Sequence, residues 1–208
     1  MDAFLAAIAD QFAAWSAAEM AAVVFAILYL LLAIRESIWC WYCAGVSTAI
    51  YVVLFMEARL YMESLLNVFY FGMAIYGWLV WRSGGADDGD REVVSWPARV
   101  HGIAIAIIIF LVVITGYALS RYTDAAYPYV DSATTYAAVW STFLVARKVL
   151  ENWWYWLVID AVSIFLYWSR GLELTALLFV LYVLMIPFGL YSWTRSVRRA
   201  AAVPVAAG

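Results

Sequence analysis

The stretch LLNVFYFGMAIYGWLVWR, residues 65–82, returns in related form as LLFVLYVLMIPFGLYSWT, residues 177–194. The two stretches are identical at seven of eighteen positions, among them a tyrosine, a glycine and a closing tryptophan in the same order. Each stretch lies in a long apolar run of the kind that forms membrane helices. We therefore interpret the chain as an internal duplication in which the two halves have the same architecture.

A second pair of similar segments extends the duplication, at a slightly different spacing. We call the separation of Leu65 from Leu177 the repeat interval. ESIWCW, residues 36–41, aligns with ENWWYW, residues 151–156. The separation between these two segments is slightly longer than the repeat interval. At this longer separation, the counterpart of Asp160 is Gly45. The alignment predicts a duplicated scaffold that carries a carboxylate in one half only.

The composition restricts the protein to one class. Of its 208 residues, 68% are hydrophobic and only 13% are charged, and the mean hydropathy is +0.88. Apolar segments of this length and number are typical of a polytopic membrane protein, and no basic run suits a nucleic acid. The pattern predicts an all-α fold of seven transmembrane helices over residues 20–34, 38–56, 64–81, 102–120, 132–146, 153–168 and 174–193.

The predicted spans divide into three, one and three. Because a single span separates two triplets, both triplets start from the same side of the membrane, as in transporters with parallel repeats that hold substrate near the midplane. We expect an interfacial amphipathic helix, a first three-helix repeat, a cytoplasmic loop with a linker helix, a second repeat and a cytoplasmic tail. Their predicted bounds are 1–18, 20–82, 83–122, 131–194 and 195–208.

The distribution of Lys and Arg predicts the orientation. With the N-terminus outside, the inner loops and tail hold nine of these residues and the outer loops hold three. Cytoplasmic loops carry an excess of positive charge, so we expect the N-terminus outside and the C-terminus inside.

A polar stripe runs along the sixth predicted span. On a helix, Asn152, Trp156, Asp160, Ser163 and Tyr167 share one face, since they are three or four residues apart. A carboxylate in the bilayer core costs about 2.5–3.5 kcal/mol or more, and it persists facing a partner or a water-filled cavity. Asp160 therefore either neutralises a cationic substrate or forms a hydrogen bond with a neighbouring helix.

A second stripe runs along the third predicted span and is formed by Asn67, Tyr70, Ala74, Gly77 and Trp81. The second half has phenylalanine where the first has this asparagine. An amide present in one half only favours recognition of a polar group. The alternative is an interhelical hydrogen bond that stabilises the bundle by about 0.6–2 kcal/mol.

Several classes of function lack the residues they need. The sequence has no phosphate-binding loop and no set of catalytic residues, so we expect neither an enzyme nor a cofactor or metal site. We interpret Cys40 and Cys43 as small apolar residues of a helix and His101 as an interfacial residue. The only lysine, Lys148, lies in a predicted loop, which excludes a retinal protein. No span contains an arginine to receive a phosphate, which favours a dephosphorylated substrate.

Two motifs resemble those of a known family, the Pnu-type (PnuC family) vitamin transporters. They are RKVLENWWYW, residues 147–156, followed by Asp160, and LLNVFY, residues 65–70, followed by Tyr76-Gly77-Trp78 and Trp81. The resemblance implies a SWEET-like build, a homotrimer, and facilitated diffusion of a vitamin precursor that a cytoplasmic kinase traps. It also implies substrate contacts by Asn67, Tyr70, Trp78, Trp81, Asn152, Trp153, Trp156 and Asp160.

The resemblance leaves the substrate between two cationic, aromatic vitamins. Nicotinamide riboside is the first expectation. Thiamine is kept as the second, because members that carry nicotinamide riboside often have glutamine where this chain has Asn67. We expect a multi-pass protein of the bacterial inner membrane with a small-molecule substrate, the lipid bilayer as its surroundings and no nucleic acid. The competing class is a membrane sensor or assembly subunit that transports nothing.

Overall fold

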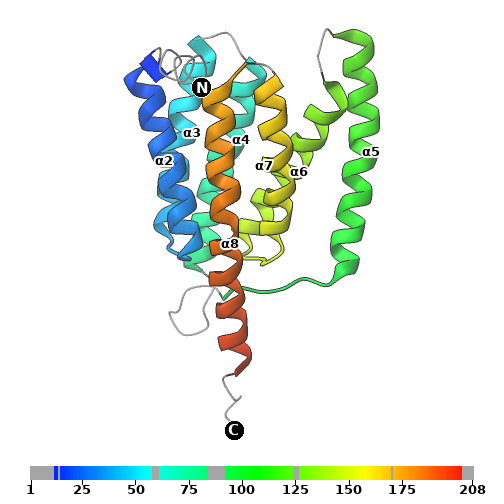
Figure 1. Cartoon of the computed structure of the whole chain (residues 1–208). Coiled ribbons are helices and arrows are strands. Elements are labelled where there is room, and N and C mark those ends of the chain that lie inside the picture. The colour runs from blue at the N-terminus through cyan, green and yellow to red at the C-terminus, as the bar shows by residue number, and fades with distance from the viewer. Residues whose placement is uncertain are drawn as a thin grey trace.

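The computed structural model describes residues 12–13, 15–57, 61–83, 92–123, 127–169 and 171–202. This part of the chain contains seven long helices, which confirms the all-α prediction (Figure 1). The predicted interfacial helix, residues 1–18, falls largely outside the described residues. Within its described part, Phe12 and Ala13 are helical, and residues 17–18 already belong to α2. The helices are α2 (Ala17–Ile34), α3 (Trp39–Glu57), α4 (Tyr61–Arg82), α5 (Ala98–Tyr122), α6 (Pro128–Ala146), α7 (Asn152–Ser169) and α8 (Glu173–Ala202).

The helix ends follow local sequence signals. Ser16 and Glu19 form a capping box at the start of α2, in which each side chain satisfies a backbone N–H of the other residue. Pro128 occupies the first turn of α6, where its missing N–H is not needed. Shortly after α2 and α6 the chain turns through Glu36 and Lys148, whose φ angles of 57° and 51° lie in the left-handed region.

The last helix is longer than predicted. We expected the seventh span to end at residue 193 and a tail to follow, but α8 continues to Ala202 and projects below the bundle (Figure 1). No glycine or proline occurs between Gly189 and Ala202 to end the helix, and arginine near a helix C-terminus interacts favourably with the helix dipole. The beginning of the predicted tail, up to Ala202, is therefore helical.

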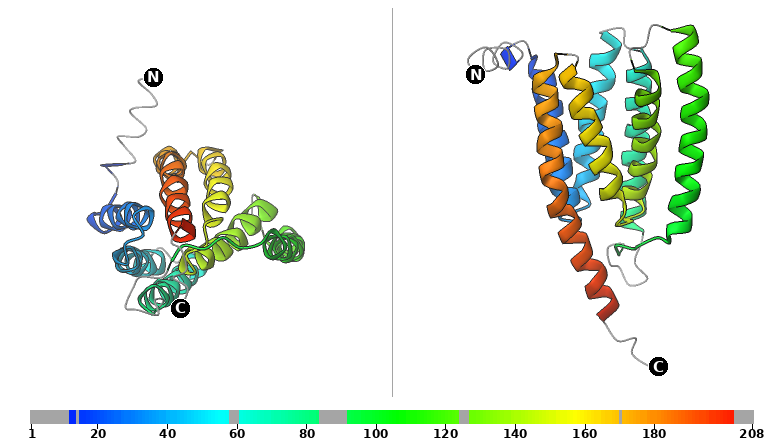
Figure 2. Two further views of the ribbon diagram at one scale, coloured as in Figure 1. Left: turned by 90° about the horizontal axis from the view of Figure 1, so that it is seen from below. Right: turned by 45° about the vertical axis from the view of Figure 1, so that its right-hand side comes forward.

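Six of the helices form a closed ring. In chain order α2, α3, α4, α6, α7 and α8 each pack against the next, and α8 packs back against α2. Helix α5 packs mainly on α6 and stands at the side of the bundle (Figure 2). We call the six packed helices the six-helix ring. The arrangement leaves α5 as a peripheral element.

The outer surface is that of a multi-pass membrane protein. Among the described residues, five helices are long and apolar enough to cross a membrane, namely α2, α3, α4, α5 and α8. The outer side chains are large and apolar, as in Ile109 and Phe110 of α5, which are 58% and 64% exposed. Exposed apolar surface of this extent marks contact with lipid. The other two helices, α6 and α7, are not in this group, and each carries an aspartate and several hydroxyl groups.

Structural features recur at the repeat interval that separates Leu65 from Leu177. Helix α2 ends at residue 34, α3 ends at 57 and α4 begins at 61, and the corresponding bounds of α6, α7 and α8 lie at 146, 169 and 173. The left-handed residues Glu36 and Lys148 are separated by the same interval. The longer separation inferred for the segment 36–41 is therefore wrong. The counterpart of Asp160 is Thr48 and not Gly45.

Candidate binding cavity and the tryptophan cluster beneath it

The six-helix ring encloses a cavity of about 530 Å³. Every ring helix contributes to its lining, and α5 contributes nothing. The cavity reaches the end of the bundle at which α2 begins, the upper end in Figure 1, because Asp131 in the first turn of α6 and Tyr167 near the end of α7 both line it. Among the described residues that line it, none comes from the loops at the lower end of the ring.

Aromatic rings dominate the cavity wall. Two stacked pairs belong to it: Tyr51 and Phe55, with centroids 5.5 Å apart, and Tyr167 and Phe179, with centroids 5.2 Å apart. Flat aromatic faces bind flat rings, and they attract a cation placed over them. The eight aromatic lining residues are Tyr29, Tyr51, Phe55, Tyr70, Trp156, Tyr167, Phe179 and Tyr182.

The charged side chains among the described lining residues all have one sign. Asp131 on α6 and Asp160 on α7 line the cavity, and the described lining residues include no lysine, arginine or histidine. Asp160 is only 4% exposed. A buried carboxylate is expensive unless a positive charge or hydrogen bonds compensate it. The cavity therefore suits a positively charged molecule better than a negatively charged one.

The lining follows the repeat interval, but its chemistry differs between the halves. Tyr70 and Tyr182 are an identical pair, whereas Asn67 pairs with Phe179. Neither Glu19 nor Thr48, the counterparts of the two aspartates, lines the cavity. The lining pairs are Ala26 and Ala138, Tyr51 and Ser163, Phe55 and Tyr167, Asn67 and Phe179, and Tyr70 and Tyr182.

The structure brings together four of the eight residues predicted to contact substrate. Asn67 and Tyr70 of α4 and Trp156 and Asp160 of α7 line the cavity. Ser163 and Tyr167, which share the polar stripe of α7, line it as well. The two stripes thus meet at one cavity, and the substrate contacts of these residues stay a prediction.

The other four predicted residues lie elsewhere. Trp81 and Trp153 are buried below the cavity, and Asn152 is fully buried at the start of α7, where its amide donates to the Val149 carbonyl at 2.7 Å. Trp78 is 38% exposed, beside the guanidinium of Arg82. Trp78 is one position beyond Gly77 of the α4 stripe and therefore points to another side of the helix.

Four tryptophans close the ring below the cavity. We call Trp41, Trp81, Trp153 and Trp193 the tryptophan cluster. Trp41 meets Trp81 edge to face at 5.5 Å, Trp153 meets Trp193 in the same way at 5.5 Å, and Trp81 and Trp193 lie 6.3 Å apart. Tyr29 of the cavity wall lies 6.0 Å from Trp41. The cluster is therefore the layer under the cavity floor.

Reciprocal contacts join the two halves at this layer. The indole N–H of Trp81 donates to the carbonyl of Val145 at 3.2 Å, and that of Trp193 donates to the carbonyl of Ala33 at 2.9 Å. The two donors are separated by the repeat interval, and so are the two acceptors. Each half thus holds the other by the same hydrogen bond.

An ion pair adds to this layer. The Lys148 ammonium lies 3.7 Å from the Glu36 carboxylate and 4.5 Å from the centre of the Trp81 ring. Ser196 of α8 donates a hydrogen bond to the same carboxylate at 2.5 Å. Lys148 is only 2% exposed, and the Glu36 carboxylate and the Trp81 ring contribute to the compensation that its buried charge needs.

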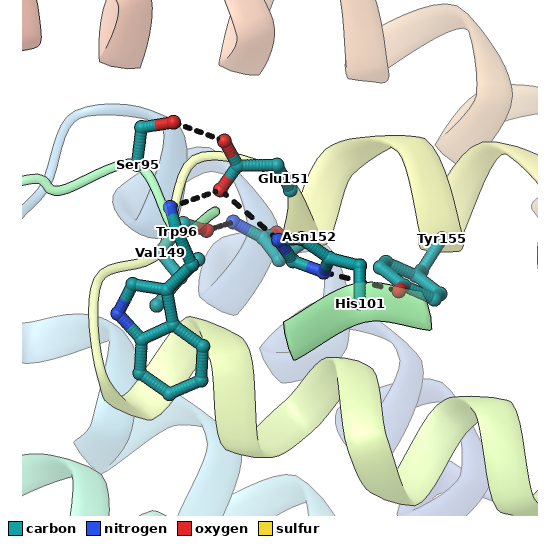
Figure 3. A network of polar contacts seen from close by, with 7 residues as sticks. All are labelled: Ser95, Trp96, His101, Val149, Glu151, Asn152 and Tyr155. Atoms are coloured by element: carbon teal, nitrogen blue, oxygen red, sulfur yellow. Dashed lines mark hydrogen bonds and ion pairs between the residues drawn. The ribbon is translucent and has the colours of Figure 1, made fainter. Parts of the chain in front are cut away.

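A second polar network ties the segment before α5 to the start of α7 (Figure 3). The Glu151 carboxylate accepts hydrogen bonds from the Ser95 hydroxyl and, at 3.2 Å, from the backbone N–H of Trp96. His101 lies 3.7 Å from this carboxylate and 3.1 Å from the Tyr155 hydroxyl. His101, which we interpreted as an interfacial residue, is therefore part of a contact between α5 and α7.

Sequence reasoning missed several lining residues, and Asp131 is the most consequential. We began the fifth predicted span at residue 132, which put Asp131 in a loop, whereas α6 begins at Pro128. The proline was the available signal, because proline favours the first turn of a helix. The tyrosines at 29 and 51 gave no signal, since membrane spans are rich in aromatic residues.

Cys40 and Cys43 are free thiols and buried in α3. In the described part of the chain no three His, Cys, Asp or Glu side chains gather as metal ligands would.

Comparisons with known proteins agree on one kind of protein. The family model described as nicotinamide mononucleotide transporter matches residues 16–195. The nicotinamide riboside transporter PnuC of Escherichia coli K12 is 20% identical over 205 residues, with 86% of each chain covered. The riboflavin/roseoflavin transporter RibM of Streptomyces davaonensis is 24% identical over 195 residues, covering 91% of this chain and 89% of RibM.

A solved structure has the same fold. The crystal structure of the vitamin B3 transporter PnuC matches with a TM-score of 0.72 at 21% identity, and the match covers 94% of this chain and 90% of that one.

Proposed function

Because the chain belongs to the nicotinamide mononucleotide transporter family, the family of the Pnu-type vitamin transporters, we propose that it carries a cationic aromatic vitamin precursor across the membrane. Nicotinamide riboside is the first candidate. Movement is by facilitated diffusion, and a cytoplasmic kinase that phosphorylates the vitamin keeps it inside the cell. The site of action is the bacterial inner membrane.

One observation carries the proposal: the cavity combines eight aromatic rings with two aspartates and no basic lining residue in the described chain. A desolvated cation over an aromatic face gains about 2 kcal/mol, and a nearby carboxylate adds to this attraction. A phosphate group would instead meet two aspartates, and the described lining offers no basic side chain to attract it. This chemistry supports the riboside over the mononucleotide.

The roles of the lining residues follow from their chemistry. Asp160 supplies the negative charge for the cationic ring, and Trp156, one turn away on α7, supplies an aromatic face. Asn67 and Tyr70 on α4 offer hydrogen bonds to the polar remainder of the substrate. We assign Asn152, Trp153 and Trp81 to the lower layer, where they contact substrate only after that layer opens, and Trp78 to the outer surface.

The proposed transport cycle uses the duplicated architecture. Seven spans in a parallel, SWEET-like arrangement of three, one and three, with the N-terminus outside, make the present conformation open to the outside. The tryptophan cluster and the ion pair between Lys148 and Glu36 then close the cytoplasmic side. Rocking of the two repeats against each other would close the outer end of the cavity and open its cytoplasmic end. We further propose a homotrimer.

Other substrates make different demands on the cavity. Thiamine is also a flat cation and is the runner-up within the same mechanism. Riboflavin is the substrate suggested by the likeness to RibM, but its ring is uncharged and gains little from two aspartates. A sensor or assembly subunit is the alternative of another class, and it needs no substrate flux.

The test is uptake by purified protein in liposomes without ATP or a partner protein. We expect nicotinamide riboside to enter, and phosphorylated nicotinamide mononucleotide to remain outside. Parallel binding measurements with thiamine and riboflavin rank the substrates. If binding occurs without flux, the protein is a sensor, and if only riboflavin enters, the charge argument is wrong.

A matched pair of variants tests the role of Asp160. Asp160→Asn keeps the size of the side chain and removes its charge, so we expect uptake of the cation to fall by at least about tenfold. Thr48→Val changes the equivalent position of the other half, where the hydroxyl bonds to the Ala44 carbonyl at 2.8 Å and does not line the cavity. Uptake by this control variant should stay near wild type.

A further inference from the structure

The two cavity aspartates lie at different depths. Asp131 stands in the first turn of α6, near the upper end of the six-helix ring. Asp160 stands nine residues before the end of α7, which corresponds to about 13 Å at the rise of an α-helix. Asp131 therefore lies nearer the mouth of the cavity, and Asp160 lies near its middle.

Asp131 and its counterpart in the first half, Glu19, have different roles. Glu19, one repeat interval earlier, stands in the first turn of α2, where it closes a capping box with Ser16 by bonds of 2.6 and 3.1 Å. In α6 the residue that corresponds to Ser16 is Pro128, which has no hydroxyl to form such a box, and Asp131 lines the cavity. A carboxylate at this position serves helix capping in one half and faces the cavity in the other.

Both carboxylates belong to one wall of the cavity. Asp131 is on α6 and Asp160 on α7, two neighbouring helices of the second half, while Asn67 stands on α4 of the first half. Negative charge in a cleft with apolar walls raises the local concentration of a cation and guides its entry. A cation that enters therefore meets Asp131 first and moves along the same wall to Asp160.

We propose that Asp131 is a specificity-determining residue, a mouth carboxylate that draws the positive ring of the substrate into the cavity ahead of Asp160. The proposal rests on the proposed transport of a cationic vitamin. It also orients the substrate: the charged ring faces α6 and α7, and the uncharged polar end faces Asn67 on α4. Asp131 thus favours cationic over neutral molecules of the same shape.

The test compares Asp131→Asn with Asp131→Glu and with Glu19→Gln as the matched control. Glutamine keeps a capping box intact, so the control changes the same helix position outside the cavity. The probes are nicotinamide riboside and its reduced dihydro form, which has the same shape and no positive charge. Initial uptake into liposomes is measured for both probes at low and high salt.

For Asp131→Asn we expect the uptake rate of the cation at low concentration to fall about three- to tenfold at low salt. The loss should shrink at high salt, because ions screen exposed charges. The uptake rate of the neutral form should not change in Asp131→Asn. The uptake rate of the cation should return to the wild-type value in Asp131→Glu and should stay at that value in Glu19→Gln. A purely structural role would slow both probes equally at every salt concentration.

Two results would overturn the role of Asp131, and a third, distinct result would overturn the proposed transport function. If wild type carries the cation and Asp131→Asn carries it equally well at low salt, Asp131 has no role in selection. If the variant slows both probes alike, the residue is structural. If wild type carries neither probe, the proposed function itself fails.

Discussion

Lys148 and Glu36 occupy the same position in the two halves of the chain and form an ion pair across them, with 3.7 Å between ammonium and carboxylate. Both residues have left-handed backbone conformations, at φ angles of 51° and 57°. Two identical charged residues at this site would repel each other. Because the two residues carry opposite charges, they attract each other and hold the two halves together.

We expect Glu36→Ala to destabilise the protein by about 3 kcal/mol, because it leaves the ammonium of Lys148 buried without its carboxylate. The double variant with Lys148→Met should recover most of the loss, since an apolar side chain needs no counter-charge. Thermal unfolding of the four proteins in detergent measures this cycle. Additive losses in the double variant would contradict a direct interaction between the two side chains.

The close packing of the tryptophan cluster gives a second prediction. A Cβ atom added at Gly77 would lie 2.4 Å from the Trp41 ring, and one added at Gly189 would lie 2.4 Å from the Trp153 ring. Alanine at either position must displace an indole, so we expect a loss of about 1–3 kcal/mol in unfolding free energy. Both variants should behave alike because the two sites are equivalent.

Gly72→Ala is the control for this pair, since nothing lies within 4 Å of the Cβ atom that it adds on α4. Alanine favours a helix over glycine by about 1 kcal/mol, so this variant should be neutral or stabilising. Equal melting temperatures for Gly72→Ala and Gly77→Ala would show that the tryptophan contact is not tight.

Helical spacing predicted two polar helix faces, and the structure shows where these faces lie. Asn67 with Tyr70 and Trp156 with Asp160 lie on faces defined by the helical period, and these faces meet in the cavity. Spacing alone could not separate Trp156, which lines the cavity, from Trp153, which is buried below it. The two indoles are one turn apart, and depth along a helix axis has no signature in periodicity.

The error in the alignment of the segment 36–41 has a different cause. Glu36 and Glu151 are alike in sequence but have unlike partners, because Glu36 meets Lys148 whereas Glu151 holds Ser95 and Trp96. Identical letters therefore suggested an equivalence that the contacts do not support. The reciprocal hydrogen bonds of Trp81 and Trp193, which identify the true interval, are visible only in three dimensions.

A third prediction concerns the amide that only one half carries. Asn67→Phe makes this position like Phe179 of the second half and removes a hydrogen-bonding group from the cavity wall. We expect the dissociation constant of nicotinamide riboside to rise by about tenfold, the value of one hydrogen bond to a substrate. Tryptophan quenching or calorimetry measures the binding. Tyr182→Phe on the opposite wall serves as a comparison, and unchanged affinity in Asn67→Phe would remove Asn67 from the site.

The last prediction concerns Glu151 and the segment that precedes α5. The Glu151 carboxylate accepts the backbone N–H of Trp96 at 3.2 Å, and nearby the Val94 N–H donates to the Lys148 carbonyl at 2.9 Å. Glu151→Ala removes the first contact and leaves the second, because the second involves backbone atoms only. We expect a loss of about 0.5–1.5 kcal/mol, the net value of a typical hydrogen bond, because these groups are only partly buried.

Hydrogen exchange distinguishes a local from a global effect of this variant. If Glu151 anchors the segment, the amide of Trp96 should exchange faster in Glu151→Ala while that of Val94 stays protected. Faster exchange at both amides would mean that the whole segment leaves α7, so the backbone contact depends on the carboxylate. Unchanged exchange at Trp96 would contradict the anchoring role, since the amide donor would then have lost its acceptor without consequence.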